Sequence, residues 1–342
     1  MFLNLQDEKI EKYFKNCYEV KREDGTLQPV RFSHKQMSIY SETKAAKIRS
    51  ACPSSIYLEM KTDSSFINIK LEALDFARDF LYLDIYIDDI FLSTVGVDAV
   101  KKLEDSIYID LSYEHIDRRE KKEKRERIQK VSIYLPHLVD IRIKEIEIED
   151  ASFIEDCSEE EKEKKKILCF GDSITQGMTS KRPSTIFPSQ LGKFFSMKVL
   201  NQGVGGYVFD ENIIDEEMNI SPHIITVAYG INDWFQHTSI DYFQEKCSGF
   251  LNKLVRTYEK AEIFLITPIW STSENELKAM GNISAIRKII EDIGKEYSRI
   301  HLVDGLKMVP NIEDYYVDGL HPNEAGFMHY SINLAKEIKA NI

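Results

Sequence analysis

Residues 30–150 show a repeated alternation of apolar and polar positions. The alternating runs are short, and most are bounded by Asp, Ser, Pro or Gly. Many short alternating strands, with no helical pattern between them, are typical of two antiparallel sheets packed face to face. We therefore expect an all-β sandwich, jelly-roll-like, in this part of the chain. The clearest runs are 56–60, 67–71, 83–87, 107–111, 131–135 and 141–148.

After Lys166 the pattern changes to short apolar runs that alternate with helical segments. A strand–helix alternation of this kind predicts a parallel sheet covered by helices on both faces. In such sheets the functional groups gather at the carboxyl ends of the strands. The predicted strands are 167–170, 198–201, 224–229, 263–267 and 300–303, and the predicted helices are 186–195, 240–258, 283–297 and 323–339.

A charged stretch at about 151–165 lies where the two patterns meet, and it predicts a linker. We accordingly expect a β-sandwich domain over 1–160 and an α/β domain over 161–342. A second charged run, 118–127, lies between predicted strands. We interpret it as a solvated loop or strand edge rather than an interaction patch, because interleaved Lys and Arg discourage edge-to-edge pairing.

Composition narrows the class of protein. The chain has 342 residues, of which 43% are hydrophobic, enough for two ordinary domains with substantial cores. A formal net charge of −12 argues against a nucleic-acid partner. The five cysteines are scattered, which favours reduced thiols over a disulfide framework or a zinc site. With no signal-peptide or membrane-spanning pattern, we expect a cytoplasmic protein without a membrane partner.

Polar residues that could take part in catalysis follow several of the predicted strands. Ser173 follows the first strand at a turn, where a serine can either attack a carbonyl or simply cap a helix. Asn232 follows the third strand and can aim its side-chain N–H at an oxyanion or bridge a turn. Asp318 and His321, three residues apart, follow the fifth strand. This spacing lets the carboxylate hold one ring nitrogen while the other faces the serine.

A glycine-rich segment follows the second strand, with the sequence Asn201-Gln-Gly-Val-Gly-Gly206. Glycines let the backbone approach a ligand closely, although a tight turn explains the segment equally well. Taken together, the strand ends supply a nucleophile, two oxyanion donors and an Asp–His pair. Acyl transfer to serine needs this set of groups.

These residues resemble the sequence blocks of the SGNH (GDSL-type) serine hydrolases. The resemblance covers about residues 165–342, with four blocks in the order and approximate spacing of the family. It implies a flavodoxin-like three-layer α/β/α fold for the second domain and an ester hydrolase that needs no metal or cofactor. The blocks are Gly171-Asp172-Ser173-Ile-Thr-Gln-Gly177, Asn201-Gln-Gly203-Val-Gly205-Gly206, Gly230-Ile-Asn232-Asp233 and Asp318-Gly-Leu-His321-Pro322.

The resemblance also implies a role for each matching residue. Ser173 is the nucleophile, and His321 is the base, oriented by Asp318. The oxyanion hole consists of the Ser173 and Gly206 amides and the Asn232 side chain. The choice of Gly206 over the two preceding glycines rests on its distance from the asparagine that opens its block.

The two-domain layout is similar to that of carbohydrate esterases with an N-terminal jelly roll, including the acetylxylan esterase group. This implies a small-molecule or oligosaccharide ester as substrate, with an acetyl group as the expected acyl part. Three aromatic residues near the strand ends, Tyr207, Trp234 and Trp270, could form a platform for a sugar ring or could pack between sheet and helix.

Other readings of the same sequence remain open. A lysophospholipase or thioesterase activity fits the same set of residues. A non-catalytic glycan-binding protein is the alternative from a different class, and the sandwich could instead be purely structural. The sequence predicts no oligomer, although it does not exclude one.

Overall fold

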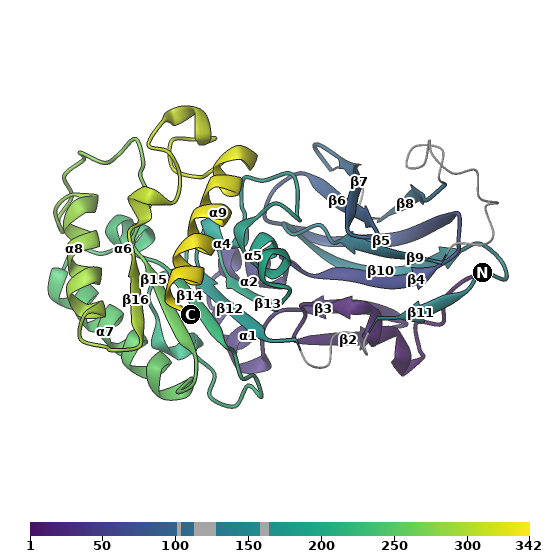
Figure 1. Cartoon of the computed structure of the whole chain (residues 1–342), viewed down its shortest axis with the longest axis horizontal. Helices are drawn as coiled ribbons and strands as arrows, with labels where there is room; N and C mark the ends of the chain where they lie inside the picture. The colour runs from purple at the N-terminus through teal and green to yellow at the C-terminus, as the bar shows by residue number, and fades with distance from the viewer. Residues whose placement is uncertain (101–103, 113–127, 158–163) are drawn as a thin grey trace. The chain divides into compact units, whose positions relative to one another are not determined.

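The computed structural model describes residues 1–100, 104–112, 128–157 and 164–342 (Figure 1). The chain forms two compact units, one of Met1–Arg31 and Ala51–Glu163 and the other of Phe32–Ser50 and Lys164–Ile342. The charged run 118–127 and part of the predicted linker lie outside the described residues. Within those residues, no helix is long and apolar enough to cross a membrane.

The first unit contains two antiparallel sheets packed face to face. Apolar side chains of both sheets form one cluster, such as Ile69 and Ile143 from one sheet and Leu83 and Ile133 from the other. The alternation in the sequence thus correctly predicts a sandwich. In sheet order, the strands are β2 (Glu19–Glu23), β3 (Thr26–Val30), β10 (Val139–Ile148), β5 (Phe66–Phe76) and β8 (Glu104–Asp110), and then β1 (Phe14–Lys15), β4 (Tyr57–Thr62), β9 (Gln129–Tyr134), β6 (Leu81–Ile87) and β7 (Ile90–Val97), with β11 (Ile154–Asp156) beside β4 and the 3₁₀-helix η1 (Glu8–Tyr13) before β1.

The strand pairs of this unit are nested within one another. β6 pairs with β7, β5 with β8, β4 with β9 and β3 with β10, all antiparallel. Such nesting means that one long antiparallel hairpin is wound into two sheets, as in a jelly roll. The hairpin of β2 and β3 turns through Asp24 and Gly25, which both have positive φ, of 48° and 78°.

The second unit is built on a five-stranded parallel sheet. Its order is β13 (Lys198–Gly203), β12 (Lys166–Gly171), β14 (Ile224–Ala228), β15 (Glu262–Ile266) and β16 (Ile300–Val303). All neighbouring strands run parallel, as predicted. Numbered within the sheet, the order is 2-1-3-4-5, which is that of flavodoxin-like folds. The direction of winding reverses between β12 and β14, and such a switch point is where ligands bind in open α/β sheets.

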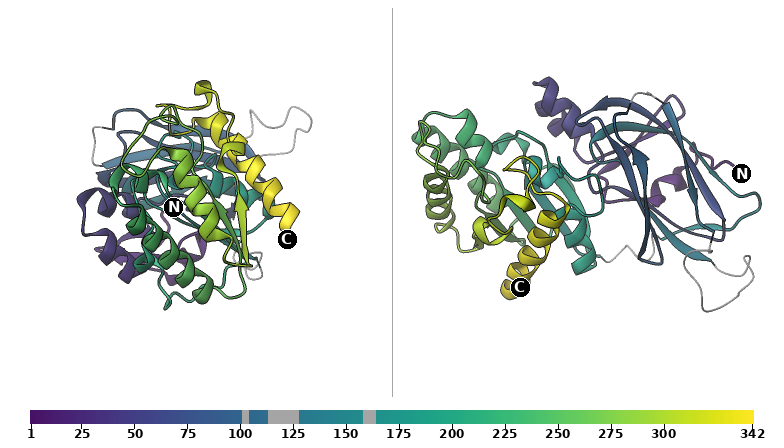
Figure 2. Two further views of the ribbon diagram at one scale, coloured as in Figure 1. Left: turned by 90° about the vertical axis from the view of Figure 1, so that its left-hand side faces the viewer. Right: turned by 90° about the horizontal axis from the view of Figure 1, so that it is seen from above.

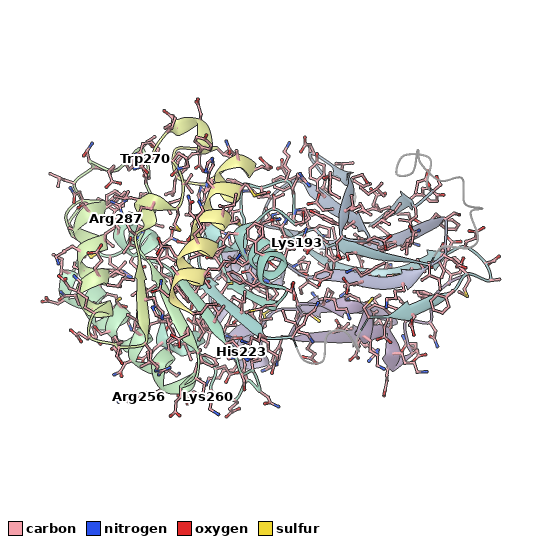
Figure 3. All side chains as sticks on the ribbon, in the orientation of Figure 1. Lys193, His223, Arg256, Lys260, Trp270 and Arg287 are labelled. Atoms are coloured by element: carbon pink, nitrogen blue, oxygen red, sulfur yellow. The ribbon has the colours of Figure 1, made fainter. Side chains whose placement is uncertain are left out.

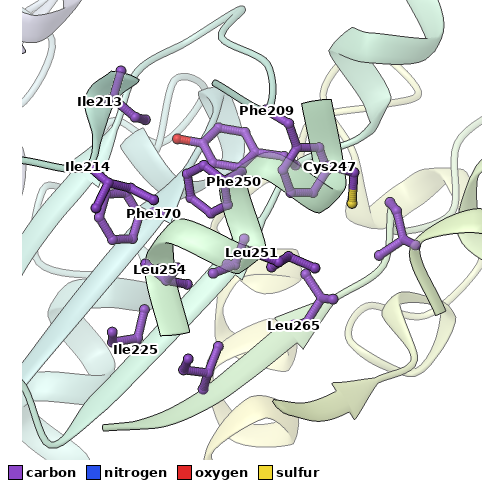
Figure 4. Packing of buried hydrophobic residues seen from close by; sticks show 14 of the residues in the cluster. Phe170, Phe209, Ile213, Ile214, Ile225, Cys247, Phe250, Leu251, Leu254 and Leu265 are labelled. Carbon is purple, nitrogen blue, oxygen red and sulfur yellow. The ribbon is translucent and has the colours of Figure 1, made fainter. Parts of the chain in front are cut away.

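Helices cover both faces of this sheet and give the unit three layers (Figures 1 and 2). On one face, α7 (Ile240–Thr257) and α8 (Ile283–Gly294) pack on the sheet, and Figure 4 shows Phe250 and Leu254 of α7 beside Phe170 of β12. On the other face lie α5 (Phe187–Phe195) and α9 (Glu324–Asn341). The shorter helices are α4 (Ser173–Gln176), α6 (Ile231–Gln236), η3 (Glu211–Ile213), η4 (Gly305–Lys307) and η5 (Glu313–Tyr315).

Residues 32–50 depart from the expected domain boundaries. They contain α1 (His34–Tyr40) and most of α2 (Lys44–Ala51), and they belong to the second unit rather than to the sandwich. The start of α1 is a capping box, in which Ser33 and Gln36 satisfy each other's backbone N–H groups. The buried Gln36 side chain also donates to Gln202 Oε1 and to the carbonyl of Ile213, both at 2.7 Å. The second unit is therefore built from two separate segments of the chain.

Replacing Gln36 with alanine tests this attachment. We expect Gln36→Ala to lower the free energy of unfolding of the second unit by about 1–3 kcal/mol, because a buried carbonyl loses its donor. The two tryptophans of the chain, Trp234 and Trp270, both lie in this unit, so their fluorescence during urea unfolding reports on it. The exposed Glu42 of the same segment provides the control Glu42→Ala, and an equal effect of the two substitutions would contradict the attachment.

Candidate active site

The carboxyl ends of the parallel strands share one edge of the second unit. Figure 3 shows Trp270, which follows β15, and the nearby Arg287 toward one end of this unit. His223 and Lys260, which precede β14 and β15, lie toward the opposite end. Each residue that the sequence places after a strand therefore lies at the same end of this unit as Trp270.

Ser173, His321 and Asp318 form a continuous hydrogen-bonded chain. The Oγ of Ser173 lies 2.8 Å from Nε2 of His321, and Nδ1 of His321 lies 2.8 Å from Oδ2 of Asp318. Ser173 is the first residue of α4, directly beyond the end of β12, and its side chain is largely buried. The structure thus brings together three residues that are up to 148 positions apart in the sequence.

A tight turn fixes the Asp318 carboxylate. Its Oδ1 accepts the backbone N–H groups of Leu320 and His321 at 3.1 and 2.8 Å, which leaves Oδ2 for the imidazole. Partial burial raises the pKa of Asp318, but the backbone and side-chain hydrogen bonds from His321 outweigh it and hold this pKa below its usual value. An ionised carboxylate only accepts hydrogen bonds, so the imidazole carries its proton on Nδ1 and Nε2 is free to accept from Ser173.

The turn that carries Ser173 lies directly on the end of the sheet. Asp172 caps α4 by accepting the N–H of Ile174 at 3.0 Å, and its other oxygen accepts from Asn232 at 3.1 Å. Burial, reinforced by the nearby Asp233, raises the pKa of Asp172 to about 7 despite these hydrogen bonds. A Cβ at Gly203 would lie 2.6 Å from the backbone nitrogen of Gln176, so only glycine lets this turn pack on β13.

Most backbone groups of the glycine-rich loop already have partners. Gly203 N–H donates to Asn201 Oδ1 and Gly205 N–H donates to Gln176 Oε1, both at 2.8 Å. The Gly205 carbonyl accepts from Arg49 and the Gly206 carbonyl from Gln236. Among the described residues, none accepts a hydrogen bond from the Gly206 N–H.

That hydrogen-bond pattern bears on the choice among the three glycines, because a donor that is already engaged cannot readily bind an oxyanion. The residues that hold the loop were not identified in the sequence. Gln176 lies inside the first block and could have been noticed there, whereas Arg49, about 150 positions upstream, gives no local signal.

The Asn232 side chain, in the first turn of α6, lies beside the turn that carries Ser173. Its Nδ2 donates to Asp172 at 3.1 Å and to the Tyr207 carbonyl at 3.2 Å. Because an amide nitrogen carries two hydrogens, both are used here. Donation to an oxyanion would require one of these bonds to be exchanged. The acceptor at Asp172 is a carboxyl group, whereas the acceptor at Tyr207 is a neutral backbone carbonyl.

The three aromatic residues proposed as a sugar platform differ in position. Trp234 is wholly buried, and its indole N–H donates to the Gly281 carbonyl at 2.9 Å, so its assignment to the substrate site is wrong. The first turn of α6 directs this side chain into the core, where the polar atom has found a partner. Tyr207 and Trp270 are both partly exposed, and the Trp270 ring lies 5.2 Å from that of Tyr316.

Comparison with known proteins shows that part of the second unit matches the sequence pattern of a protein family. Residues 169–328 match the GDSL-like lipase/acylhydrolase family. No curated protein matches the chain.

Solved structures are similar in fold to most or nearly all of this chain. A salicylyl-acyltransferase from a tetracycline biosynthetic pathway has a TM-score of 0.81 at 17% identity, covering 99% of this chain and 97% of that one. A putative GDSL-like lipase from Bacteroides ovatus has a TM-score of 0.73 at 17% identity, covering 99% and 98%. A family two carbohydrate esterase from Clostridium thermocellum, in complex with cellohexaose, has a TM-score of 0.62 at 12% identity, covering 84% and 93%.

At these identities the structural likeness concerns the fold, and the match in sequence identifies the family. The matched segment contains all four strand-end blocks, from the turn at Ser173 to the turn at Asp318 and His321. The second unit of this chain therefore contains a domain, at residues 169–328, that matches the GDSL-like lipase/acylhydrolase family, and this match supports a carboxylic ester hydrolase.

Proposed function

We propose that this protein is a serine esterase that hydrolyses small acyl esters, in the first place acetyl esters of carbohydrates. The observation that carries the proposal is the chain of two 2.8 Å contacts from Ser173 through His321 to Asp318. It lies at the carboxyl edge of the sheet beside the switch point, where open α/β sheets bind their ligands.

Acylation begins at the Ser173 hydroxyl. His321 Nε2 takes the hydroxyl proton while Oγ attacks the acyl carbonyl carbon, and the resulting imidazolium is stabilised by Asp318. The tetrahedral intermediate collapses as the C–O bond to the alcohol breaks, and the alcohol leaves with the proton from Nε2. Water then attacks the acyl-enzyme with His321 again as base, which releases the carboxylic acid and restores Ser173.

The oxyanion is stabilised by N–H groups around the nucleophile. The first N–H groups of a helix have no partner within the helix, so Ser173 N–H at the start of α4 can serve as one donor. The Gly206 N–H is the second donor. Asn232 is the third, and it exchanges its bond to the Tyr207 carbonyl for one to the oxyanion.

The substrate is proposed from the fold and the surroundings of the site. The carbohydrate esterase from Clostridium thermocellum that shares the fold was solved with cellohexaose, which supports an oligosaccharide as the alcohol part. The partly exposed rings of Tyr207 and Trp270 are candidates for contact with a sugar ring. The salicylyl-acyltransferase of the same fold implies the alternative that an alcohol, rather than water, accepts the acyl group.

A series of p-nitrophenyl esters tests the activity and the acyl length together. We expect acetate to be hydrolysed with a higher kcat/KM than butyrate or octanoate, and Ser173→Ala to abolish turnover because it removes the attacking oxygen. The matched control is Ser196→Ala, a serine at the end of α5 outside the triad, which should keep full activity. A preference for octanoate would favour a lipid or thioester substrate, and activity in Ser173→Ala would refute the proposal.

Asn232→Ala should lower kcat about a hundredfold or more. An oxyanion donor of this kind contributes on the order of 3 kcal/mol to transition-state stabilisation. Steady-state kinetics on p-nitrophenyl acetate measure the loss, with the exposed Asn212 replaced by alanine as the control. An Asn232→Ala enzyme within about threefold of wild type would remove Asn232 from the oxyanion hole.

Asp172 should make the stability of the second unit depend on pH. Its pKa is raised to about 7 by burial, above the usual value of 3.8, so the folded state holds this proton more tightly than the unfolded state does. The corresponding stabilisation is complete below about pH 4 and is lost as the pH rises to about 7. Urea unfolding followed by tryptophan fluorescence should therefore show wild type losing stability relative to Asp172→Asn between about pH 4.5 and about pH 8.

The control for this prediction is Asp292→Asn. Asp292 is exposed, and hydrogen bonds from Lys288 and Lys295 lower its pKa, so it stays ionised across that range. Parallel stability curves for wild type and Asp172→Asn would contradict the raised pKa.

A further inference from the structure

The peptide group between Gly205 and Gly206 is held from its carbonyl side by an arginine. Arg49 Nη1 donates to the Gly205 carbonyl at 2.8 Å. That carbonyl and the Gly206 N–H belong to the same peptide group, and no peptide bond among the described residues is cis. In a trans peptide the C=O and N–H bonds point in opposite directions. Fixing the carbonyl on Arg49 therefore fixes the direction of the Gly206 N–H.

The rest of the loop is held in the same manner. The buried Gln176 side chain accepts the Gly205 N–H at 2.8 Å and donates to the Arg49 backbone carbonyl at 2.8 Å. Gln236 donates to the Gly206 carbonyl at 2.9 Å. Gln176, Arg49 and Gln236 therefore bind the Gly205 N–H, the Gly205 carbonyl and the Gly206 carbonyl, and they leave the Gly206 N–H between these groups available for a substrate.

Arg49 also packs closely against the loop. A Cβ built on Gly206, whose φ is +77°, would lie 2.9 Å from Arg49 Nη1, and one on Gly205 would lie 3.3 Å from Arg49 Cδ. The guanidinium can approach this peptide because both residues are glycines. A charged donor on a carbonyl polarises the peptide and strengthens the N–H at its other end.

We propose that Arg49 is a positioning residue for the oxyanion hole, which aims and polarises the Gly206 N–H through the Gly205 carbonyl. The proposal rests on the proposed esterase function. It assigns a role in that reaction to the segment 32–50, which lies outside the matched family domain. Because the oxyanion exists only after Ser173 has attacked, the contribution of Arg49 belongs to the transition state and should be seen in kcat rather than in KM.

The test compares Arg49→Met and Arg49→Lys with wild type on p-nitrophenyl acetate. The methionine variant keeps most of the side-chain length but has no donor, so kcat should fall about tenfold to a hundredfold with KM unchanged. Lysine keeps the charge and a donor but not the planar fork, so its loss should be smaller. The matched control is Arg299→Met. Arg299 also donates to backbone carbonyls, those of Tyr258 and Ala261, but at the amino ends of the strands.

Inhibition by a trifluoromethyl ketone provides a second measurement. Its result would not change in the Arg49 variants if Arg49 only supported the fold. Ser173 Oγ adds to the ketone carbon, its proton passes to His321, and the adduct carries an oxyanion in the place of the intermediate. The inhibition constant of this ketone should rise in Arg49→Met by about the same factor as kcat falls, and it should not change in Arg299→Met. Unfolding followed by tryptophan fluorescence shows whether each variant is folded.

The possible outcomes separate this inference from the proposed function. If wild type shows no turnover dependent on Ser173, the function fails and the role of Arg49 fails with it. If turnover depends on Ser173 but both Arg49 variants keep the wild-type kcat, only the Arg49 proposal is overturned. A rise in KM alone would mean that Arg49 contacts the substrate, and a fall in kcat with unchanged ketone affinity would mean that it only supports the fold; either result overturns the proposal. If Arg49→Met does not fold, the lysine variant decides by the same criteria.

Discussion

The site depends on the packing of small residues at the carboxyl ends of the parallel strands. Gly171 at the end of β12 lies opposite Gly203 of β13 and Ala228 of β14, so three strands end at the same height. A Cβ on Gly171 would lie 2.0 Å from Oγ1 of Thr175, which shows how closely the turn that carries Ser173 packs against the end of the sheet. Larger side chains at these positions would move the turn away from the sheet. Ser173 would then be separated from the N–H groups of the segments that follow β13 and β14.

Buried polar groups then fix the loops that the sheet brings together. Gln176 and Asp172, both almost fully buried, are each bonded on two sides, Gln176 to Gly205 and Arg49 and Asp172 to Ile174 and Asn232. In a low-dielectric interior a satisfied network of this kind is rigid, whereas an unpaired member would be costly. The strand-end loops therefore gain an order that their glycine content alone would not provide.

The parts of the fold that the sequence predicts are those encoded by local patterns. Alternation identified the sandwich strands, and the positions of Ser173, Asn232 and the Asp–His pair followed from their places after apolar runs. The helices within 32–50 were missed, although Ser33 followed three residues later by Gln36 is a recognisable capping box. No local pattern could identify Arg49, whose partners lie more than 120 positions away, or show that α6 turns Trp234 inward. Both facts depend on tertiary packing, which periodicity does not encode.

The loops of the candidate site are hydrogen-bonded directly to the segment that carries Ser173. Within residues 173–179, Gln176 bonds to the glycine-rich loop, and Thr179 Oγ1 donates to the Pro322 carbonyl at 2.7 Å, directly after His321. The same short segment thus carries the Ser173 hydroxyl, one hydrogen bond to the glycine-rich loop and one hydrogen bond to the loop that contains His321. A small displacement of this segment would carry both loops with it, because each is bonded to the segment and not only to the sheet. The distances between Ser173, His321 and the glycine-rich loop are therefore maintained by hydrogen bonds between the loops as well as by the sheet.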